Sequence, residues 1–351
     1  MLFRSGPMVV PFLAAFPIAY ASWKWIESPY RRQTNWRGWR LFFAAGLAIL
    51  VPITMSLVIW QQKGFPRRLS TARTQPPSSR ESMTTSYDTS PIDFKIDELP
   101  LLGDRNVEPS FLVWGDSHAL ALAPILNEVA SQYGKSGRLV ARGGTPPLIA
   151  AWRGDSVAAG ADSGLRWSAN ALEAMGARQW EAIVVIAGWQ IYVHETGLRD
   201  ASSGTSSSET SAGVLKRQLQ RTAAAMPTTS KVFWLQPAPR QSTDLARALG
   251  NRALNKWAPE VGKGIDREEY DQQVSEIREA FQSLTQLPGH NWVDVTSNFF
   301  TEQGRARLFD GTEFCYLDDN HVSQAGARLY FGDAIREIME TIGGEIGRAH
   351  V

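Results

Sequence analysis

The sequence predicts two transmembrane helices followed by a three-layer α/β domain, in which helices cover both faces of a mainly parallel sheet. Two long apolar stretches without charges lie in the first 60 residues. From about residue 93 onward, short apolar runs alternate with stretches of helical periodicity. Strands separated by helices favour a parallel sheet, because parallel neighbours must be joined by a crossover that is usually a helix.

The two apolar stretches are long enough to cross a membrane as helices. Residues 5–23 and 41–60 contain 19 and 20 residues without a charge, and about 20 apolar residues span the hydrocarbon core. The loop between them carries one acid, Glu27, and five basic residues: Lys24, Arg31, Arg32, Arg37 and Arg40. Short positive loops stay in the cytoplasm, so both outer ends are expected on the opposite side. A cleaved signal peptide would instead need a basic start and a shorter apolar core.

Two segments rich in serine and threonine predict flexible chain. Residues 70–92 contain fourteen Ser, Thr or Pro among 23 and have no apolar periodicity, so they are expected to form a tether. Residues 201–212 contain eight Ser or Thr and are expected to form a surface loop of the domain. The predicted division is therefore 1–63 for the membrane helices, 64–92 for the tether and 93–344 for the α/β domain.

The elements of the predicted domain follow from its apolar runs. The expected buried strands are residues 111–114, 181–187, 231–235 and 291–295. The expected amphipathic helices are residues 119–133, 213–226, 267–285 and 324–342. In a sheet of this kind ligands bind beyond the carboxyl ends of the strands. A reactive residue directly after a strand is therefore a candidate for function.

Composition excludes several classes of protein. The chain has 36 basic and 35 acidic residues, a formal net charge of +1, whereas a nucleic-acid-binding domain normally carries a basic patch or stripe. The single cysteine, Cys315, excludes an intramolecular disulfide and a zinc site built from several cysteines. We expect this cysteine to be a small buried apolar residue. No nucleic-acid partner and no metal are expected.

A candidate nucleophile follows the first strand. Gly115, Asp116, Ser117 and His118 stand between that strand and a helix. Free backbone N–H groups at the start of a helix can stabilise a developing oxyanion beside Ser117. A serine in this position is equally typical of a helix N-cap, so both interpretations stay open on these four residues alone. Asp116 is expected to order the turn.

A candidate base lies near the end of the domain. Asp318, Asp319, Asn320 and His321 precede the last helix. A serine nucleophile needs a base that accepts its proton, and the base needs a carboxylate that fixes its tautomer. Asp318 and His321 are three residues apart and can meet across a loop. Taken alone, the same four residues also fit a solvated polar loop with a helix cap.

The two motifs together, in this order and about 200 residues apart, resemble the SGNH (GDSL-like) hydrolase family. More closely, the chain resembles the C-terminal part of acyltransferase-3 proteins that carry a fused SGNH domain. The stretch WIESPYRR at residues 25–32 resembles the end of that family's last conserved membrane segment. By this resemblance, residues 1–63 are a remnant of the acyltransferase-3 domain, and residues 93–344 are an SGNH-like catalytic domain.

The resemblance also implies roles for individual residues. Ser117 is the expected nucleophile, His321 the base and Asp318 the carboxylate that orients the base. Gly144, in the stretch GGTPP, is expected to donate its backbone N–H to the oxyanion hole together with Ser117. The third block departs from the family pattern, because the stretch AGWQIY at residues 187–192 contains no asparagine. Gln190 can supply an amide donor there; otherwise the site relies on the two backbone N–H groups.

The resemblance implies an extracytoplasmic O-acyltransferase that acts on a cell-surface polysaccharide such as lipopolysaccharide or peptidoglycan. The expected acyl group is acetyl. One alternative is a carbohydrate esterase that passes the acyl group to water, and another is a non-catalytic domain that positions glycan. No cofactor is expected in the SGNH domain itself. Acyl-CoA is expected only as the ultimate donor, through acyltransferase-3 membrane segments that would be further partners.

The expected location is the bacterial inner membrane, as a multi-pass protein with its C-terminal domain in the periplasm or outside the cell. Because the acyltransferase-3 family has about ten membrane segments, we expect the chain to be a piece of a longer protein. The last seven residues, 345–351, are expected to be a non-native tail.

Overall fold

The structure is a computed structural model. The chain forms two compact units, residues 1–70 and 71–351. Each unit is described by itself. The residues that the structure describes are 16–17, 20, 23–24, 28, 38–61, 87, 91–156, 158–201, 209–244, 263–284, 286–311 and 313–343.

The described part of the first unit is dominated by one helix, α3 (Gly38–Gln61), which covers the second predicted span, 41–60. Among the described residues, no helix combines the length and the apolar character needed to cross a membrane. Most of the first predicted span, most of the predicted tether and the expected tail lie outside the described residues. The two transmembrane helices therefore stay predictions.

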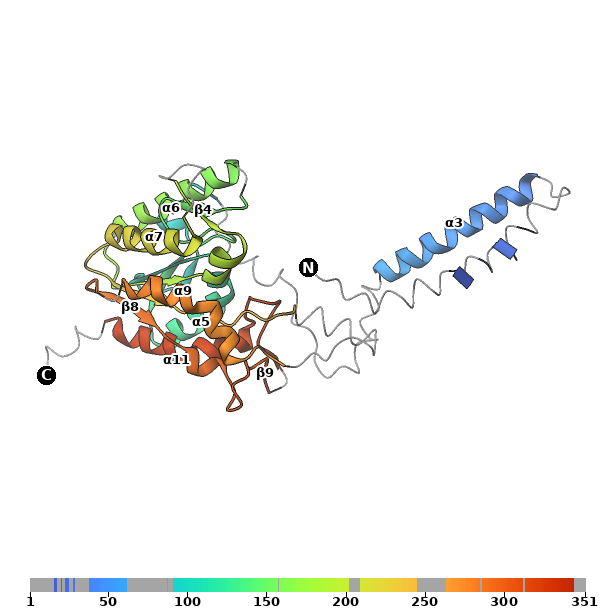
Figure 1. The fold of residues 1–351 in the computed structure, drawn as a ribbon. Helices are drawn as coiled ribbons and strands as arrows, with labels where there is room; N and C mark the ends of the chain where they lie inside the picture. The colour runs from blue at the N-terminus through green and yellow to red at the C-terminus, as the bar shows by residue number, and fades with distance from the viewer. Residues whose placement is uncertain are drawn as a thin grey trace. The chain divides into compact units, whose positions relative to one another are not determined.

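The second unit is built on a six-stranded sheet (Figure 1). Its strands run in the order β1-β3-β2-β5-β7-β8. Four neighbouring pairs are parallel, and only β1 runs antiparallel to its neighbour β3. The strands are β1 (Leu101–Gly103), β2 (Phe111–Gly115), β3 (Ser136–Ala141), β5 (Ala182–Ile186), β7 (Lys231–Leu235) and β8 (His290–Val293). The predicted mainly parallel sheet is confirmed.

Helices form the outer layers of the domain. The long helices are α5 (Ser117–Gln132), α6 (Ala158–Gly176), α7 (Ser211–Ala225), α9 (Arg267–Gln282) and α11 (Gln324–Thr341). Helix α5 packs against α11, and α7 packs against α9. From β2 the chain steps to β3 on one side, whereas the later strands extend the sheet on the other. Right-handed crossovers therefore place α5 on the face opposite α7 and α9.

The differences from the predicted elements have local causes. Strand β3, which was not predicted, has the sequence SGRLVA, in which glycine and arginine interrupt the apolar pattern. The prediction of a buried last strand was wrong, because β8 is the edge of the sheet and three of its four residues are only half-buried. Short strands such as β4 (Ala151–Arg153) and β6 (Leu198–Asp200), which pair with each other, were also missed.

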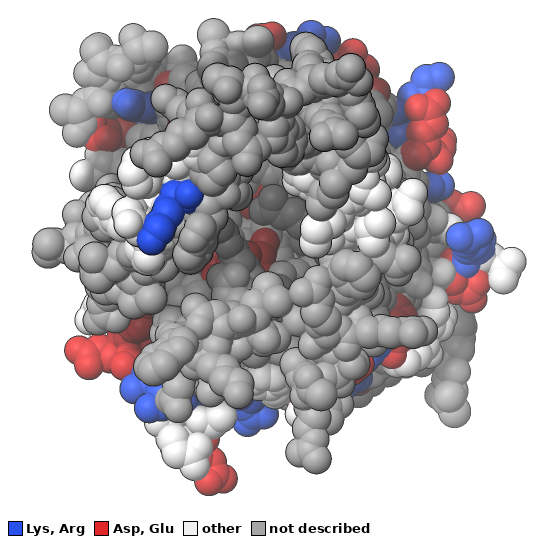
Figure 2. Space-filling model, turned by 90° about the vertical axis from the view of Figure 1, so that its right-hand side faces the viewer, with Lys and Arg blue, Asp and Glu red and all other residues white. Residues whose placement is uncertain are grey.

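An aromatic cluster fills the core between the sheet and α9. The ring centroid of Phe281 lies 5.2 Å from Trp189, 5.7 Å from Trp234 and 4.4 Å from Trp292. Trp189 and Trp234 are fully buried, so Trp189, which follows β5, belongs to the core. Outside the core, charges of both signs are interspersed on the described part of the face in Figure 2, in keeping with the near-zero net charge.

Replacing Phe281 by alanine should lower the free energy of unfolding by about 3–5 kcal/mol, because a large cavity would open among three tryptophans. Urea unfolding of the full chain, followed by tryptophan fluorescence, measures this change. Phe309→Ala is the matched control: Phe309 is 38 % exposed, and its truncation should cost less than about 1 kcal/mol. Equal losses in the two variants would contradict the proposed core.

Candidate active site

The nucleophile turn lies where β2 ends and α5 begins. Asp116 is the N-cap of α5, and its carboxylate accepts a hydrogen bond from the backbone N–H of His118 at 2.8 Å. Ser117 is therefore the first residue of the helix, and the alternative that Ser117 is the N-cap was wrong. A side chain at Gly115 would come within 2.1 Å of the Ile186 carbonyl oxygen, so the close packing of β2 on β5 requires glycine there.

Asp116 is almost completely buried at this turn. It is 1 % exposed, and its second carboxylate oxygen accepts hydrogen bonds from the Gly188 N–H at 3.0 Å and the Tyr192 hydroxyl at 2.7 Å. Burial by itself would raise the pKa of Asp116, but the charge of His118 and the hydrogen bonds lower it. The carboxylate therefore orders the strand–helix turn, in agreement with its expected role.

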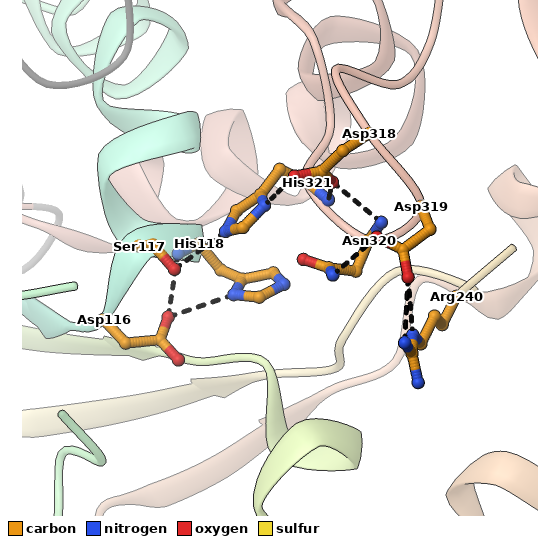
Figure 3. A network of polar contacts seen from close by, with 8 residues as sticks. All are labelled: Asp116, Ser117, His118, Arg240, Asp318, Asp319, Asn320 and His321. Carbon is orange, nitrogen blue, oxygen red and sulfur yellow. Dashed lines mark hydrogen bonds and ion pairs between the residues drawn. The ribbon is translucent and has the colours of Figure 1, made fainter. Parts of the chain in front are cut away.

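The predicted triad residues meet in one chain of hydrogen bonds (Figure 3). His321 Nε2 lies 2.8 Å from Ser117 Oγ. On the other side of the ring, His321 Nδ1 lies 2.8 Å from Asp318 Oδ2. These two contacts have the geometry of the nucleophile–base and base–carboxylate pairs that acyl transfer through a serine requires. With the proton on Nδ1, His321 Nε2 is free to accept the proton of the serine hydroxyl.

The loop of the base is shaped around Asp318. Its Oδ1 accepts hydrogen bonds from the backbone N–H groups of Asn320 at 2.9 Å and His321 at 2.7 Å. Burial would raise the pKa of Asp318, but the hydrogen bond and charge of His321 and these backbone donors outweigh it. They hold the pKa of Asp318 well below its ordinary value. The carboxylate is therefore ionised at neutral pH and can stabilise the imidazolium that forms when His321 accepts a proton.

Arg240 braces this loop from a neighbouring segment. Its Nε and Nη2 donate to one carboxylate oxygen of Asp319, at 3.0 and 2.9 Å, and its Nη1 pairs with Glu195. The backbone N–H of Gln241 also donates to the Asp319 carbonyl at 2.7 Å. The sequence contains no motif that identifies Arg240. Its position shortly after β7 nevertheless places it near the carboxyl ends of the parallel strands, where ligands bind.

The predicted oxyanion donors differ in their surroundings. Gly144 has φ +69°, a left-handed conformation that favours glycine, and a side chain at its neighbour Gly143 would lie 4.0 Å from the Ser117 Cβ. The glycine loop therefore borders Ser117. Gln190 is buried, and its amide donates to the Ala238 carbonyl at 2.9 Å. One N–H of this amide is thus already used, and the oxyanion roles of Gly144 and Gln190 stay predictions.

Three other titratable side chains, Cys315, His194 and His290, lie outside the triad. Cys315 is fully buried, which raises the pKa of its thiol to about 11. His194 is bonded through Nε2 to the Gln273 carbonyl at 2.9 Å. His290 is the first residue of β8 and accepts a hydrogen bond from Trp234 Nε1 at 3.1 Å. Within the described ranges, no group of three or more His, Cys, Asp or Glu side chains is placed to hold a metal ion.

Replacing Asp318 by asparagine should lower the rate of acylation of Ser117 by about 10⁴-fold, because His321 would lose its orienting carboxylate. The rate is measured as the burst of alcohol released from an activated acetyl ester. The surface variant Asp333→Asn should leave the burst unchanged. A loss smaller than about tenfold in Asp318→Asn would contradict the assigned triad.

Asp318 should also make stability depend on pH. Because its pKa in the folded protein is lower than in the unfolded chain, the ionised carboxylate stabilises the fold above about pH 4. This contribution is lost as the pH falls through the folded-state pKa. The difference in the free energy of unfolding between wild type and Asp318→Asn should therefore be larger at pH 6 than at pH 3, as measured by urea titration. A difference that stays constant or grows towards pH 3 would contradict an ionised, hydrogen-bonded Asp318.

Several solved structures match this chain at low identity, each with a TM-score below 0.5. The periplasmic domain of a lipopolysaccharide acetyltransferase from Salmonella ser. Paratyphi A is 16 % identical, with a TM-score of 0.47, and the match covers 66 % of this chain and 84 % of that one. The C-terminal catalytic domain of peptidoglycan O-acetyltransferase A from Streptococcus pneumoniae is 13 % identical, with a TM-score of 0.34 and coverage of 68 % and 96 %. A carbohydrate acetylesterase family member from Sinorhizobium meliloti is 14 % identical, with a TM-score of 0.37 and coverage of 68 % and 100 %.

Among curated proteins, no match was found. A family model does match: it describes an SGNH domain fused to AT3 domains and covers residues 85–333 of this chain. That range includes the nucleophile turn, the glycine loop and the loop of the base. The match extends over more than half of the chain, and the chain therefore belongs to the family of SGNH domains that are fused to AT3 (acyltransferase-3) domains.

Proposed function

We propose that this protein is an extracytoplasmic O-acyltransferase. It transfers an acyl group, for which acetyl is the first candidate, through Ser117 to a hydroxyl of a cell-surface polysaccharide. The observation that carries the proposal is the hydrogen-bonded series Ser117–His321–Asp318, with 2.8 Å at each link. Membership of a family in which the SGNH domain is fused to AT3 domains supports acyl transfer.

In the first half of the reaction, His321 Nε2 accepts the proton of the Ser117 hydroxyl while Oγ attacks the carbonyl carbon of the acyl donor. The negative oxygen of the tetrahedral intermediate is stabilised by the backbone N–H groups of Ser117 and Gly144. His321 then returns its proton to the leaving group, and the acyl group remains on Ser117 as an ester. Asp318 stays ionised throughout.

In the second half, a sugar hydroxyl takes the place of the leaving group. His321 accepts its proton, the sugar oxygen attacks the acyl carbon, and Ser117 regains its proton when the ester bond to Oγ breaks. The acylated sugar is released and the enzyme is restored. The same acyl-enzyme reacts with water in an esterase, so the two activities differ only in the acceptor.

The acyl group is proposed to come from cytoplasmic acyl-CoA through AT3 membrane segments. The SGNH domain itself needs no cofactor in this scheme. Its proposed location is outside the cytoplasm, attached to the bacterial inner membrane, where lipopolysaccharide, peptidoglycan or another exported glycan is within reach. The family to which the chain belongs supports this location.

Incubation of the purified full chain with p-nitrophenyl acetate should give a burst of nitrophenol and a mass increase of one acetyl group on Ser117. Ser117→Ala should show neither. Ser275→Ala is the control, because Ser275 is an exposed serine of α9 that bonds only to its own helix. A folded wild-type chain without an adduct would contradict the catalytic proposal and favour a domain that only positions glycan.

The acceptor is identified by chasing the acetylated chain with polysaccharides. Peptidoglycan fragments or lipopolysaccharide should accelerate loss of the acetyl group from Ser117 at least tenfold over buffer, and should themselves become acetylated. Loss of the acetyl group at one rate with every sugar and with buffer alone would show an esterase instead.

A further inference from the structure

A second aspartate–histidine pair lies directly beside the triad. His118 Nδ1 is 3.2 Å from Asp116 Oδ1. The His118 ring stacks on the ring of His321, with centroids 4.6 Å apart and planes inclined by 28°. Figure 3 shows the two rings side by side, each beside its own aspartate. The base of the triad therefore rests with one face against His118, a residue that the proposed reaction does not use.

His118 connects the two loops that form the site. Its second ring nitrogen points toward Asn320 in Figure 3, and the backbone of Asn320 is one of the groups that raise the pKa of His118. Burial would lower the pKa of His118, but the charge and hydrogen bond of Asp116 and the Asn320 contact raise it. A protonated imidazole can donate through both nitrogens, which suits a ring placed between a carboxylate and a backbone acceptor.

The space that the His118 ring occupies is kept open by a glycine. A side chain at Gly188 would come within 2.2 Å of the His118 Cε1 atom. Gly188 follows β5, and its own N–H donates to Asp116. The ring of His118, which is 12 % exposed, packs directly over Gly188.

We propose that His118 is a positioning residue: it holds the His321 ring in line with Ser117 by stacking on it and by joining the nucleophile turn to the loop of the base. The expected effect of His118 on the rate of acylation rests on the proposed function. Ser117 and His321 lie on separate elements, so their alignment depends on contacts between these elements. A displacement of about 1 Å at a reacting group can cost about 10²-fold in rate.

The kinetic test compares three variants of the full chain with wild type. His118→Phe keeps a flat ring but has no N–H groups and loses the contact with Asp116, whereas His118→Gln keeps a side-chain N–H donor. His290→Phe is the matched control, because His290 is also a half-buried ring that stacks on an aromatic neighbour, Trp234. It lies at the amino end of β8, whereas the site lies at the carboxyl ends of the parallel strands.

At saturating p-nitrophenyl acetate, His118→Phe should acylate Ser117 about 10–100-fold more slowly than wild type. KM should stay within about twofold, because a positioning role leaves the binding of the ester unchanged, and His118→Gln should recover most of the rate that His118→Phe loses. His290→Phe should stay within about twofold of wild type. An unchanged rate in His118→Phe, a change in KM alone, or a loss of fold without rescue by glutamine would overturn the proposal.

A spectroscopic test does not depend on acylation. The ¹⁵N chemical shifts of the His321 ring should show a proton on Nδ1 and none on Nε2 at neutral pH in wild type, and a mixture of tautomers in His118→Phe. Identical shifts in the two proteins would overturn the positioning role. If wild type itself forms no acetyl-enzyme, the proposed function fails, and the ring shifts still decide whether His118 orients His321.

Discussion

The hydrogen bond between Ser117 Oγ and His321 Nε2 joins segments that lie 204 residues apart in the chain. It can form only because the parallel sheet brings the carboxyl ends of its strands to one edge, where Ser117 follows β2 and the loop of the base reaches across. Two features of the domain allow this hydrogen bond to form. Glycine at position 115 lets β2 approach β5, and buried Asp116 fixes the turn that presents the serine.

Three aspartates of the site, Asp116, Asp318 and Asp319, are bound by partners that lie on several elements of the fold. Asp318 is kept ionised by its own loop, and Asp319 is tied to Arg240 on the segment after β7. The contacts of Asp116 extend to Gly188 and Tyr192 beyond β5. A buried carboxylate is stable only when hydrogen bonds and nearby positive groups replace its lost hydration. The polar network therefore couples the chemistry of the triad to the packing of three separate loops.

The parts of this molecule that depend on local pattern could be predicted from the sequence. The runs FLVW and VFWL have the uniform apolar character of strands buried on both faces, and the structure has strands there. The residues of the proposed triad could be predicted because a family motif lies at each end of the domain. Strand β3 was missed because Arg138 stands inside it, and only the fold shows that this guanidinium bonds to the Leu99 carbonyl at 2.7 Å. Arg240 and the stacking of His118 on His321 depend on contacts between distant segments, which a single sequence does not reveal.

The central claim is that His321 activates Ser117 as the nucleophile. It is tested most directly by treating the full chain with a fluorophosphonate and locating the adduct by peptide mass spectrometry. The account predicts a single adduct on the peptide that contains Ser117, formed about 10³-fold more slowly in His321→Gln, because the serine would lose its base. An adduct at another residue, or equal rates in the two proteins, would contradict it.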